Sequence, residues 1–120
     1  MPWYQRDSAL KMLFKTERRI ALRAALYVVR TEAQSSDEEQ ARLVASAAKM
    51  LGDGRSKPAI DALVECLTCR HDQVRRNTLT SLGVLTGVAE TPPSGSQGTD
   101  QAWRAIREKY ENWLKTNRTK

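Results

Sequence analysis

The chain has 120 residues, of which 40% are hydrophobic and 28% charged, and its net charge is +6, which is ordinary for one globular domain with its own core. Its apolar runs are too short for a membrane-spanning helix, and its first residues lack the apolar segment of a secretion signal. We therefore expect a cytoplasmic protein with free cysteines and no membrane partner; the alternative is mitochondrial import, because residues 1–30 are rich in arginine.

Residues 7–32 contain neither Gly nor Pro and carry apolar residues at helical spacing. The pattern predicts either one long helix or two helices that separate near residues 15–17, and it does not decide between the two. Asp7 or Ser8 is the expected cap of the first turn. Residues 1–34 are accordingly assigned to an N-terminal helical region.

The segment that follows has a clear helix start. Ser36 and Glu39 have the spacing of a capping box, and acidic residues fill the first turn. The helix is expected to end at 52–54, where Gly-Asp-Gly interrupts the pattern. The predicted buried face consists of Val44, Ala47, Ala48 and Leu51.

Two further helices are predicted before residue 88. Pro58 is expected in the first turn of the first of them, where its missing N–H costs little. Asp72 is the expected N-cap of the second, which should stop at Gly87. The predicted buried stripes are Ile60, Leu63, Val64 and Leu67 on the first helix, and Val74, Thr78, Leu82 and Leu85 on the second.

Residues 35–87 form a repeat core. The stretch LVASAAKMLG, residues 43–52, aligns with VRRNTLTSLG, residues 74–83, at a spacing of 31 residues, and an apolar segment of helical period lies between them. A two-helix repeat near this length is typical of an α-solenoid. Proteins of this kind more often hold a partner than perform chemistry.

The last part of the chain is predicted to be a loop over residues 88–99, rich in Pro, Gly and Ser, and a helix over residues 100–117 capped by Thr99. One face of this helix carries Trp103, Ile106, Tyr110, Trp113 and Leu114. We expect this face to cover the open end of the solenoid, since terminal repeats must hide one face. The alternative is a docking surface, with Trp103, Tyr110 and Trp113 as the candidate protein interface.

Three motifs carry a family resemblance. They are Leu51-Gly52-Asp53-Gly54 followed by Pro58-Ala59-Ile60, then Asp72-Gln73-Val74-Arg75, then Leu82-Gly83. Residues 41–87 thereby resemble the short bacterial HEAT repeat, also called the PBS-lyase HEAT-like repeat. The resemblance implies an all-α, armadillo-like fold: a short right-handed α-solenoid of antiparallel helix hairpins with a terminal amphipathic capping helix. It also implies that Asp72 caps the second helix of the pair and that Arg75 ties neighbouring repeats together.

One cluster suggests metal or thiol chemistry. Cys66-Leu67-Thr68-Cys69-Arg70-His71 offers two thiolates and an imidazole, but a closed zinc site normally takes four ligands, and the chain has no other Cys or His. Cys-x-x-Cys can also be redox-active, although this pair falls at a helix end rather than at a helix start. We expect Cys66 to pack between helices and residues 69–71 to form the turn. No catalytic residue, cofactor or metal is predicted.

The positive charge is concentrated at the two ends of the chain. Residues 1–34 hold seven Lys/Arg against three Asp/Glu, and residues 99–120 hold six against three. The candidate basic surface consists of Arg18, Arg19, Arg23, Arg104 and Arg107. If these side chains converge on one face, they would follow a phosphate backbone, so nucleic-acid binding is the alternative function.

The function favoured by these patterns is a non-enzymatic scaffold or adaptor that binds another protein, or a small subunit of a larger assembly. A positive rim would steer an acidic partner. The second alternative is an enzyme helper or a chromophore-lyase-like protein, because the HEAT-like family includes such members. An array this short is also a candidate for self-association as a homo-oligomer.

Overall fold

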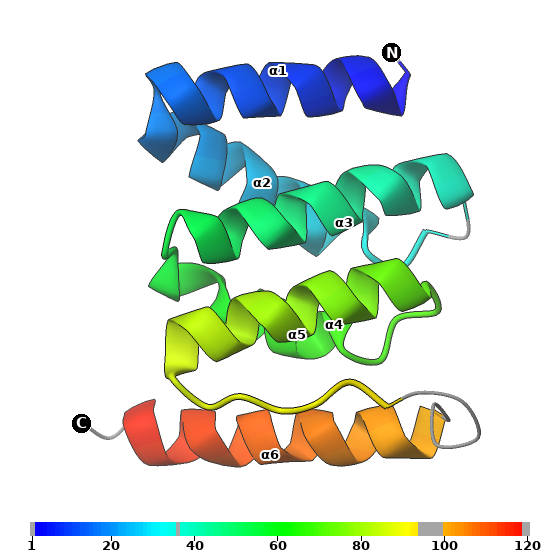
Figure 1. Ribbon diagram of the computed structural model, residues 1–120, viewed down its shortest axis with the longest axis vertical. Helices are drawn as coiled ribbons and strands as arrows, with labels where there is room; N and C mark the ends of the chain where they lie inside the picture. The colour runs from blue at the N-terminus through cyan, green and yellow to red at the C-terminus, as the bar shows by residue number, and fades with distance from the viewer. Residues whose placement is uncertain (1, 36, 94–99, 119–120) are drawn as a thin grey trace.

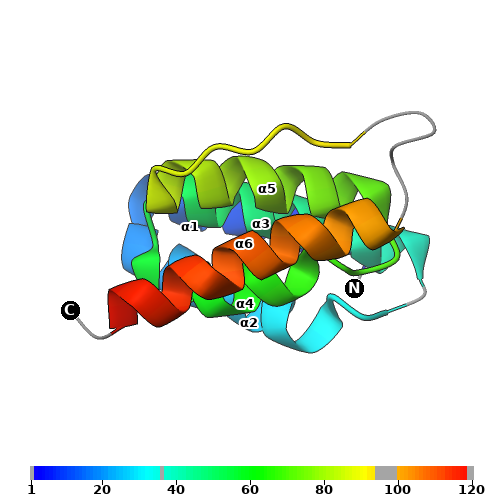
Figure 2. The same ribbon diagram turned by 90° about the horizontal axis from the view of Figure 1, so that it is seen from below.

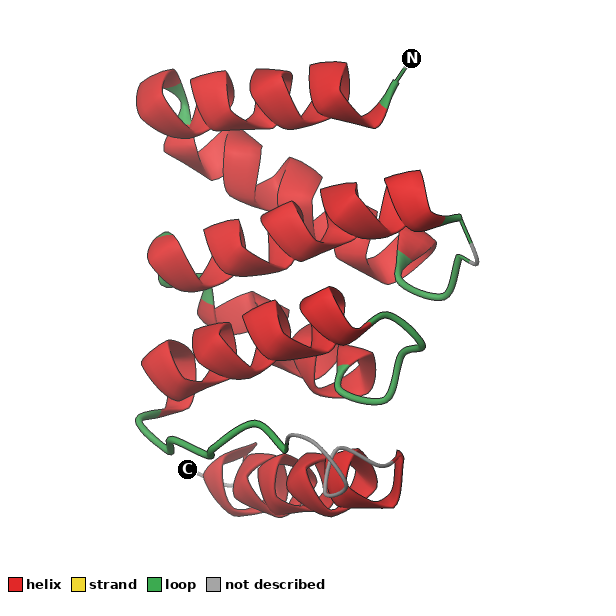
Figure 3. Ribbon diagram, turned by 45° about the vertical axis from the view of Figure 1, so that its right-hand side comes forward, coloured by secondary structure: helices red, strands yellow, loops and turns green. Residues whose placement is uncertain are grey.

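The computed structural model describes residues 2–35, 37–93 and 100–118, and within this part of the chain every regular element is a helix (Figure 3). The all-α prediction is therefore confirmed at this level. None of the described helices has both the length and the apolar character needed to cross a bilayer. The elements are α1 (Trp3–Thr16), α2 (Arg18–Glu32), α3 (Glu38–Asp53), the 3-10 turn η1 (Lys57–Ala59), α4 (Ile60–Cys66), α5 (Asp72–Thr86) and α6 (Asp100–Arg118).

The helices form two layers, one behind the other, and within each layer they are stacked along the long axis of the molecule. Helices α1, α3 and α5 lie one below another in the first layer, while α2 and α4 lie behind them (Figure 1). Helix α6 closes the lower end of the stack and crosses beneath α4 (Figure 2). The most extensive packing joins α3 to α5 and α2 to α3. A right-handed HEAT-like solenoid in the full sense stays a prediction.

The N-terminal region contains two helices rather than one. Glu17 has φ −136° and ψ 73°, which ends α1, and α2 begins at the next residue. Helix α1 starts at Trp3 after Pro2, so the predicted cap at Asp7 or Ser8 is wrong. Asp7 lies one turn into the helix and is buried, where it accepts a hydrogen bond from the Ser46 hydroxyl of α3 and pairs with Lys11.

Two other predicted caps also differ from the structure. Helix α3 is capped by Asp37, whose side chain accepts a hydrogen bond from the Glu39 backbone N–H at 2.9 Å, while Ser36 lies outside the described residues. The N-cap of α5 is His71, so Asp72 is the first helical residue and makes no cap hydrogen bond. Its carboxylate instead accepts a hydrogen bond from Arg76 Nε at 2.6 Å, which explains why it does not turn back to the helix start.

The predicted helix ends and buried stripes agree with the structure better than the predicted caps do. Helix α3 ends at Gly54 and α5 at Gly87, whose φ of 78° is the left-handed region that glycine tolerates. Pro58 lies in η1 rather than in the first turn of α4. Every residue of the three predicted stripes between 44 and 85 is buried, which confirms the helical spacing as a guide to the core.

The two halves of the repeat, α3 and α5, pack directly against each other. An added Cβ on Gly52 would lie 2.7 Å from the Ser81 Cα, so the two backbones approach where only glycine fits. The Ser81 hydroxyl donates to the Ala48 carbonyl at 2.5 Å, and the Asn77 amide donates to the Ala45 carbonyl at 2.9 Å. These contacts join α3 and α5 across the repeat core.

Candidate functional site

A hollow of about 630 Å³ lies at the lower end of the stack, along α6 from Asp100 to Lys115. It is lined by residues of α6 together with Arg75 of α5 and Thr68, which follows α4. We call it the α6 hollow, and its principal side chains are Arg75, Trp103, Arg104, Arg107, Glu111 and Lys115. It brings together three residues that the sequence singled out separately as an aromatic anchor and as basic surface.

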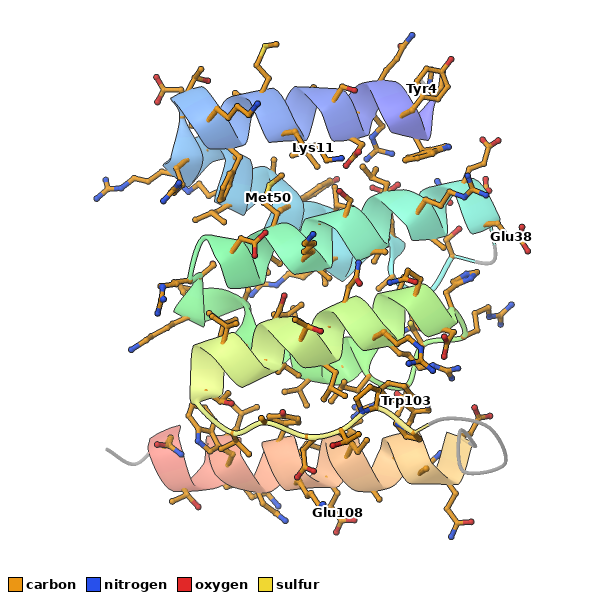
Figure 4. The ribbon with its side chains drawn as sticks, in the orientation of Figure 1. Tyr4, Lys11, Glu38, Met50, Trp103 and Glu108 are labelled. Carbon is orange, nitrogen blue, oxygen red and sulfur yellow. The ribbon has the colours of Figure 1, made fainter. Side chains whose placement is uncertain are left out.

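Trp103 and Arg75 form the inner wall of the α6 hollow. Trp103 is 1% exposed and points toward α5, whereas Glu108 on the same helix points away from the stack (Figure 4). The Arg75 guanidinium carbon lies 5.2 Å from the centroid of the Trp103 ring, within cation–π range. Arg75 therefore joins α5 to α6, in keeping with a residue that ties one structural unit to the next.

The hydrogen bonding of this wall is incomplete. Arg75 makes two long ion pairs, 3.5 Å to Asp72 and 3.4 Å to Asp100. Its Nε atom and the Trp103 Nε1 atom are buried without a hydrogen-bond partner. A buried donor left unsatisfied costs roughly 1–3 kcal/mol, and both groups can only donate. Because both atoms are buried within the fold, a ligand in the hollow does not reach these donors in this conformation.

Arg107 fixes the position of α6 over the end of α4. Its Nε donates to Glu111 Oε1 at 2.7 Å, and its Nη1 donates to the Thr68 hydroxyl at 2.7 Å. The first contact spans one helical turn and the second reaches the turn after α4. Because both bonds hold the guanidinium in one orientation, the floor of the hollow is preorganised.

The rim of the α6 hollow is cationic. Arg104 and Lys115 are exposed and have no ion-pair partner among the described residues. The lining has four cationic side chains against three acidic ones, Asp100, Glu108 and Glu111. Since Arg107 already binds Glu111, the unpaired positive charge lies mainly at Arg104 and Lys115.

The aromatic stripe of α6 packs inward. Tyr110 is 1% exposed, and its hydroxyl donates to the Val88 carbonyl at 2.6 Å, which joins α6 to the extended segment 88–93. Burial raises the pKa of the Tyr110 phenol to about 12. Trp113 is half-buried against the core. In this conformation Trp103 and Tyr110 cannot touch a partner, and of the three candidate interface residues only Trp113 retains exposed surface. Thr99 and residues 94–99 of the predicted loop lie outside the described residues.

The candidate basic surface is divided between two places. Arg18, Arg19 and Arg23 are exposed on the first half of α2, while Arg104 and Arg107 belong to α6. Helix α4 lies between these two helices in the stack (Figure 1). The two groups therefore do not form one continuous strip.

The cysteine cluster is placed in the core. Cys66 and Cys69 are buried free thiols. Burial raises the pKa of the Cys66 thiol from 9.0 to about 12 and also raises the pKa of Cys69. The His71 ring nitrogen Nε2 lies 2.8 Å from the Ser35 carbonyl oxygen, linking the two loops on one side of the stack. Among the described side chains no three of His, Cys, Asp and Glu gather as metal ligands.

The sequence does not predict the contact between Arg75 and Trp103. The sequence identified each residue, but for different reasons, and nothing in the spacing of 28 residues indicates that they meet. The sequence gives one weak indication of a site at the start of α5. Arg75 and Arg76 follow Asp72 at ion-pair spacing, so two guanidinium groups lie close together there. Comparison with models of protein families, with curated proteins and with solved structures found no match for this chain.

Proposed function

We propose that this protein is a non-enzymatic, HEAT-like binding module that holds an acidic segment of another protein at the α6 hollow. The observation that supports this proposal is the rim of unpaired cations, Arg104 and Lys115, above the buried pair of Arg75 and Trp103. Carboxylate oxygens accept hydrogen bonds and carry the complementary charge. In this view the protein acts as an adaptor or as a small subunit of a larger assembly.

Two physical features favour a stable contact at this place. Arginine and aromatic side chains dominate the energetics of many interfaces, particularly where they are desolvated and held in position. Arg107 and Arg75 are both held by neighbours within the fold, so binding would cost little side-chain entropy. The exposed Arg104 and Lys115 would mainly raise the association rate with an acidic partner.

The test uses a charge reversal at the rim with a matched control. Tagged wild-type protein, an Arg104→Glu/Lys115→Glu variant and a Lys49→Glu/Lys57→Glu variant are incubated with native lysate, with and without nuclease, and captured proteins are identified by mass spectrometry. The control changes the net charge equally, and its two lysines are exposed on other elements.

We expect a defined partner that survives nuclease, is retained by the control variant and is lost from the rim variant. Its binding surface should be acidic, and its direct affinity should fall with salt. Capture that is equal for all three proteins would contradict the proposal. Recovery of nucleic acid alone would favour the alternative, binding of a phosphate backbone.

A further inference from the structure

A second hollow lies at the opposite end of the stack, between α1 and α2. It measures about 310 Å³ and is lined almost wholly by apolar groups. We call it the open-end groove, and its lining includes Arg6, Ala9, Leu13, Ala24, Tyr27 and Val28. It shares no residue with the α6 hollow.

The layer arrangement leaves a helix-sized position vacant at this groove. Helix α4 has α2 on one side and α6 on the other. Helix α2 has α4 on its inner side, but no described helix lies on its outer side, behind α1 (Figures 1 and 3). A further second-layer helix would occupy the same position relative to α2 that α2 occupies relative to α4.

Tyr27 is the exposed large hydrophobic side chain of the groove, and Ile20 continues the same face of α2 beyond the groove lining. Ile20 is 52% exposed and Tyr27 is 66% exposed, and they lie seven residues apart on one face of α2 with Ala24 between them. Ile20 and Tyr27 are two of the six large hydrophobic side chains that are exposed in the described residues. Exposed apolar side chains that adjoin an apolar groove are typical of an interaction site.

Charge beside the groove identifies the kind of helix that fits. Arg19, Arg23 and Arg30 form an adjacent stripe along α2 at helical spacing, and none has an ion-pair partner among the described residues. Arg6, by contrast, is satisfied by Glu32, with both guanidinium nitrogens bound at 2.8 and 2.6 Å. A second copy of this chain would bring like-charged arginine stripes together, which disfavours it as the occupant.

We propose that the open-end groove, together with the adjoining face of α2 as far as Ile20, binds an amphipathic helix of a partner protein. Apolar residues of that helix would lie against Ile20, Ala24 and Tyr27, and acidic residues along one flank would face the arginine stripe. This mode places an apolar helix face into a groove and uses the flanking charges for selectivity. The bound helix would cover α2 in the way that α6, an amphipathic helix of the chain itself, covers α4 at the other end.

The test uses designed peptides as probes. A fluorescein-labelled peptide of about 16 residues, which matches the length of α2, carries Leu at positions i, i+3, i+4 and i+7 and Glu on its flank. A second peptide has Lys in place of each Glu. Fluorescence anisotropy is measured with the full chain as wild type, Tyr27→Asp, Arg19→Glu/Arg23→Glu and Val84→Asp. Val84 is exposed on α5 and serves as the matched control for an added aspartate.

We expect the Glu-flanked peptide to bind wild type and Val84→Asp equally. Binding should be weakened at least about tenfold by Tyr27→Asp and by the arginine reversal, and the Lys-flanked peptide should bind at least about tenfold more weakly. Circular dichroism checks that each variant is folded. No binding to wild type, equal binding of both peptides, or full binding by Tyr27→Asp would each overturn the proposal. So would a wild-type dimer in sedimentation that Tyr27→Asp dissociates, because the occupant would then be a second copy.

Discussion

At the lower end of the stack, an amphipathic helix of the chain itself covers α4, and Trp103 and Tyr110 are almost completely removed from water. At the upper end, no described helix covers α2, and Ile20 and Tyr27 remain more than half exposed. Both ends present apolar side chains at helical spacing, so the pattern of residues alone does not distinguish them. Whether an apolar helix face is buried therefore depends on whether a further helix packs against it.

Replacing the central aromatic residue at each end should give the largest contrast. Trp103→Ala removes a buried ring and its contact with Arg75, so we expect a loss of about 3–5 kcal/mol in the free energy of unfolding. Tyr27→Ala removes an exposed ring and should change it by no more than about 0.5 kcal/mol. Urea unfolding of the two variants measures both values. Equal losses would show that the upper end is covered in solution.

Glycine substitutions test the interior between the two ends. In Gly52→Ala the new methyl group would meet the Ser81 backbone, so we expect a destabilisation of about 1–3 kcal/mol. The repeat-equivalent Gly83 has only atoms at 3.9 Å or more around an added Cβ. Gly83→Ala should therefore be neutral or stabilise α5 by up to about 1 kcal/mol. If the two substitutions have the same effect, α3 and α5 do not approach as described.

Alkaline pH should lower the free energy of unfolding through two groups, Cys66 and Tyr110. Cys66 and Tyr110 have pKa values raised to about 12 in the folded state, so the unfolded chain loses these protons first. Their contribution is present below the ordinary pKa values and is lost as pH rises toward the folded values. We expect a loss on the order of 1 kcal/mol at about pH 10.

The urea midpoint measured between about pH 8 and pH 11 follows this change. We expect Cys66→Ala and Tyr110→Phe to be less stable than wild type at neutral pH, because one loses packing and the other a hydrogen bond to Val88. Both should nevertheless show a shallower decline with pH than wild type. An unchanged slope in both variants would mean that other groups cause the alkaline loss.

A modest effect is expected at the open end, from the ion pair between Arg6 and Glu32. The two side chains join α1 to α2 through a fork of two hydrogen bonds. A double-mutant cycle with Arg6→Met and Glu32→Gln should give a coupling of about 1 kcal/mol that decreases with added salt. A coupling near zero would mean that this ion pair does not help to hold α1 against α2.

Part of the candidate site was predictable and part was not. Trp103, Arg104 and Arg107 were identified from the pattern of one helix, because amphipathic spacing is a local property. Their grouping with Arg75 depends on how α6 crosses α4 and α5, which no local pattern encodes. For the same reason the sequence did not reveal that the arginines of α2 and α6 are separate.

The sequence by itself determined the helical class, the buried stripes of α3, α4 and α5, and the end of α5 at Gly87, because helical period and glycine conformation act within a few residues. Only the tertiary structure decided which polar residues cap helices and which turn to distant partners. Asp7 binds Ser46 of α3, and His71 lies against the Ser35 carbonyl, across separations of 39 and 36 residues. Such partners compete with local capping, and their presence depends on how the layers stack.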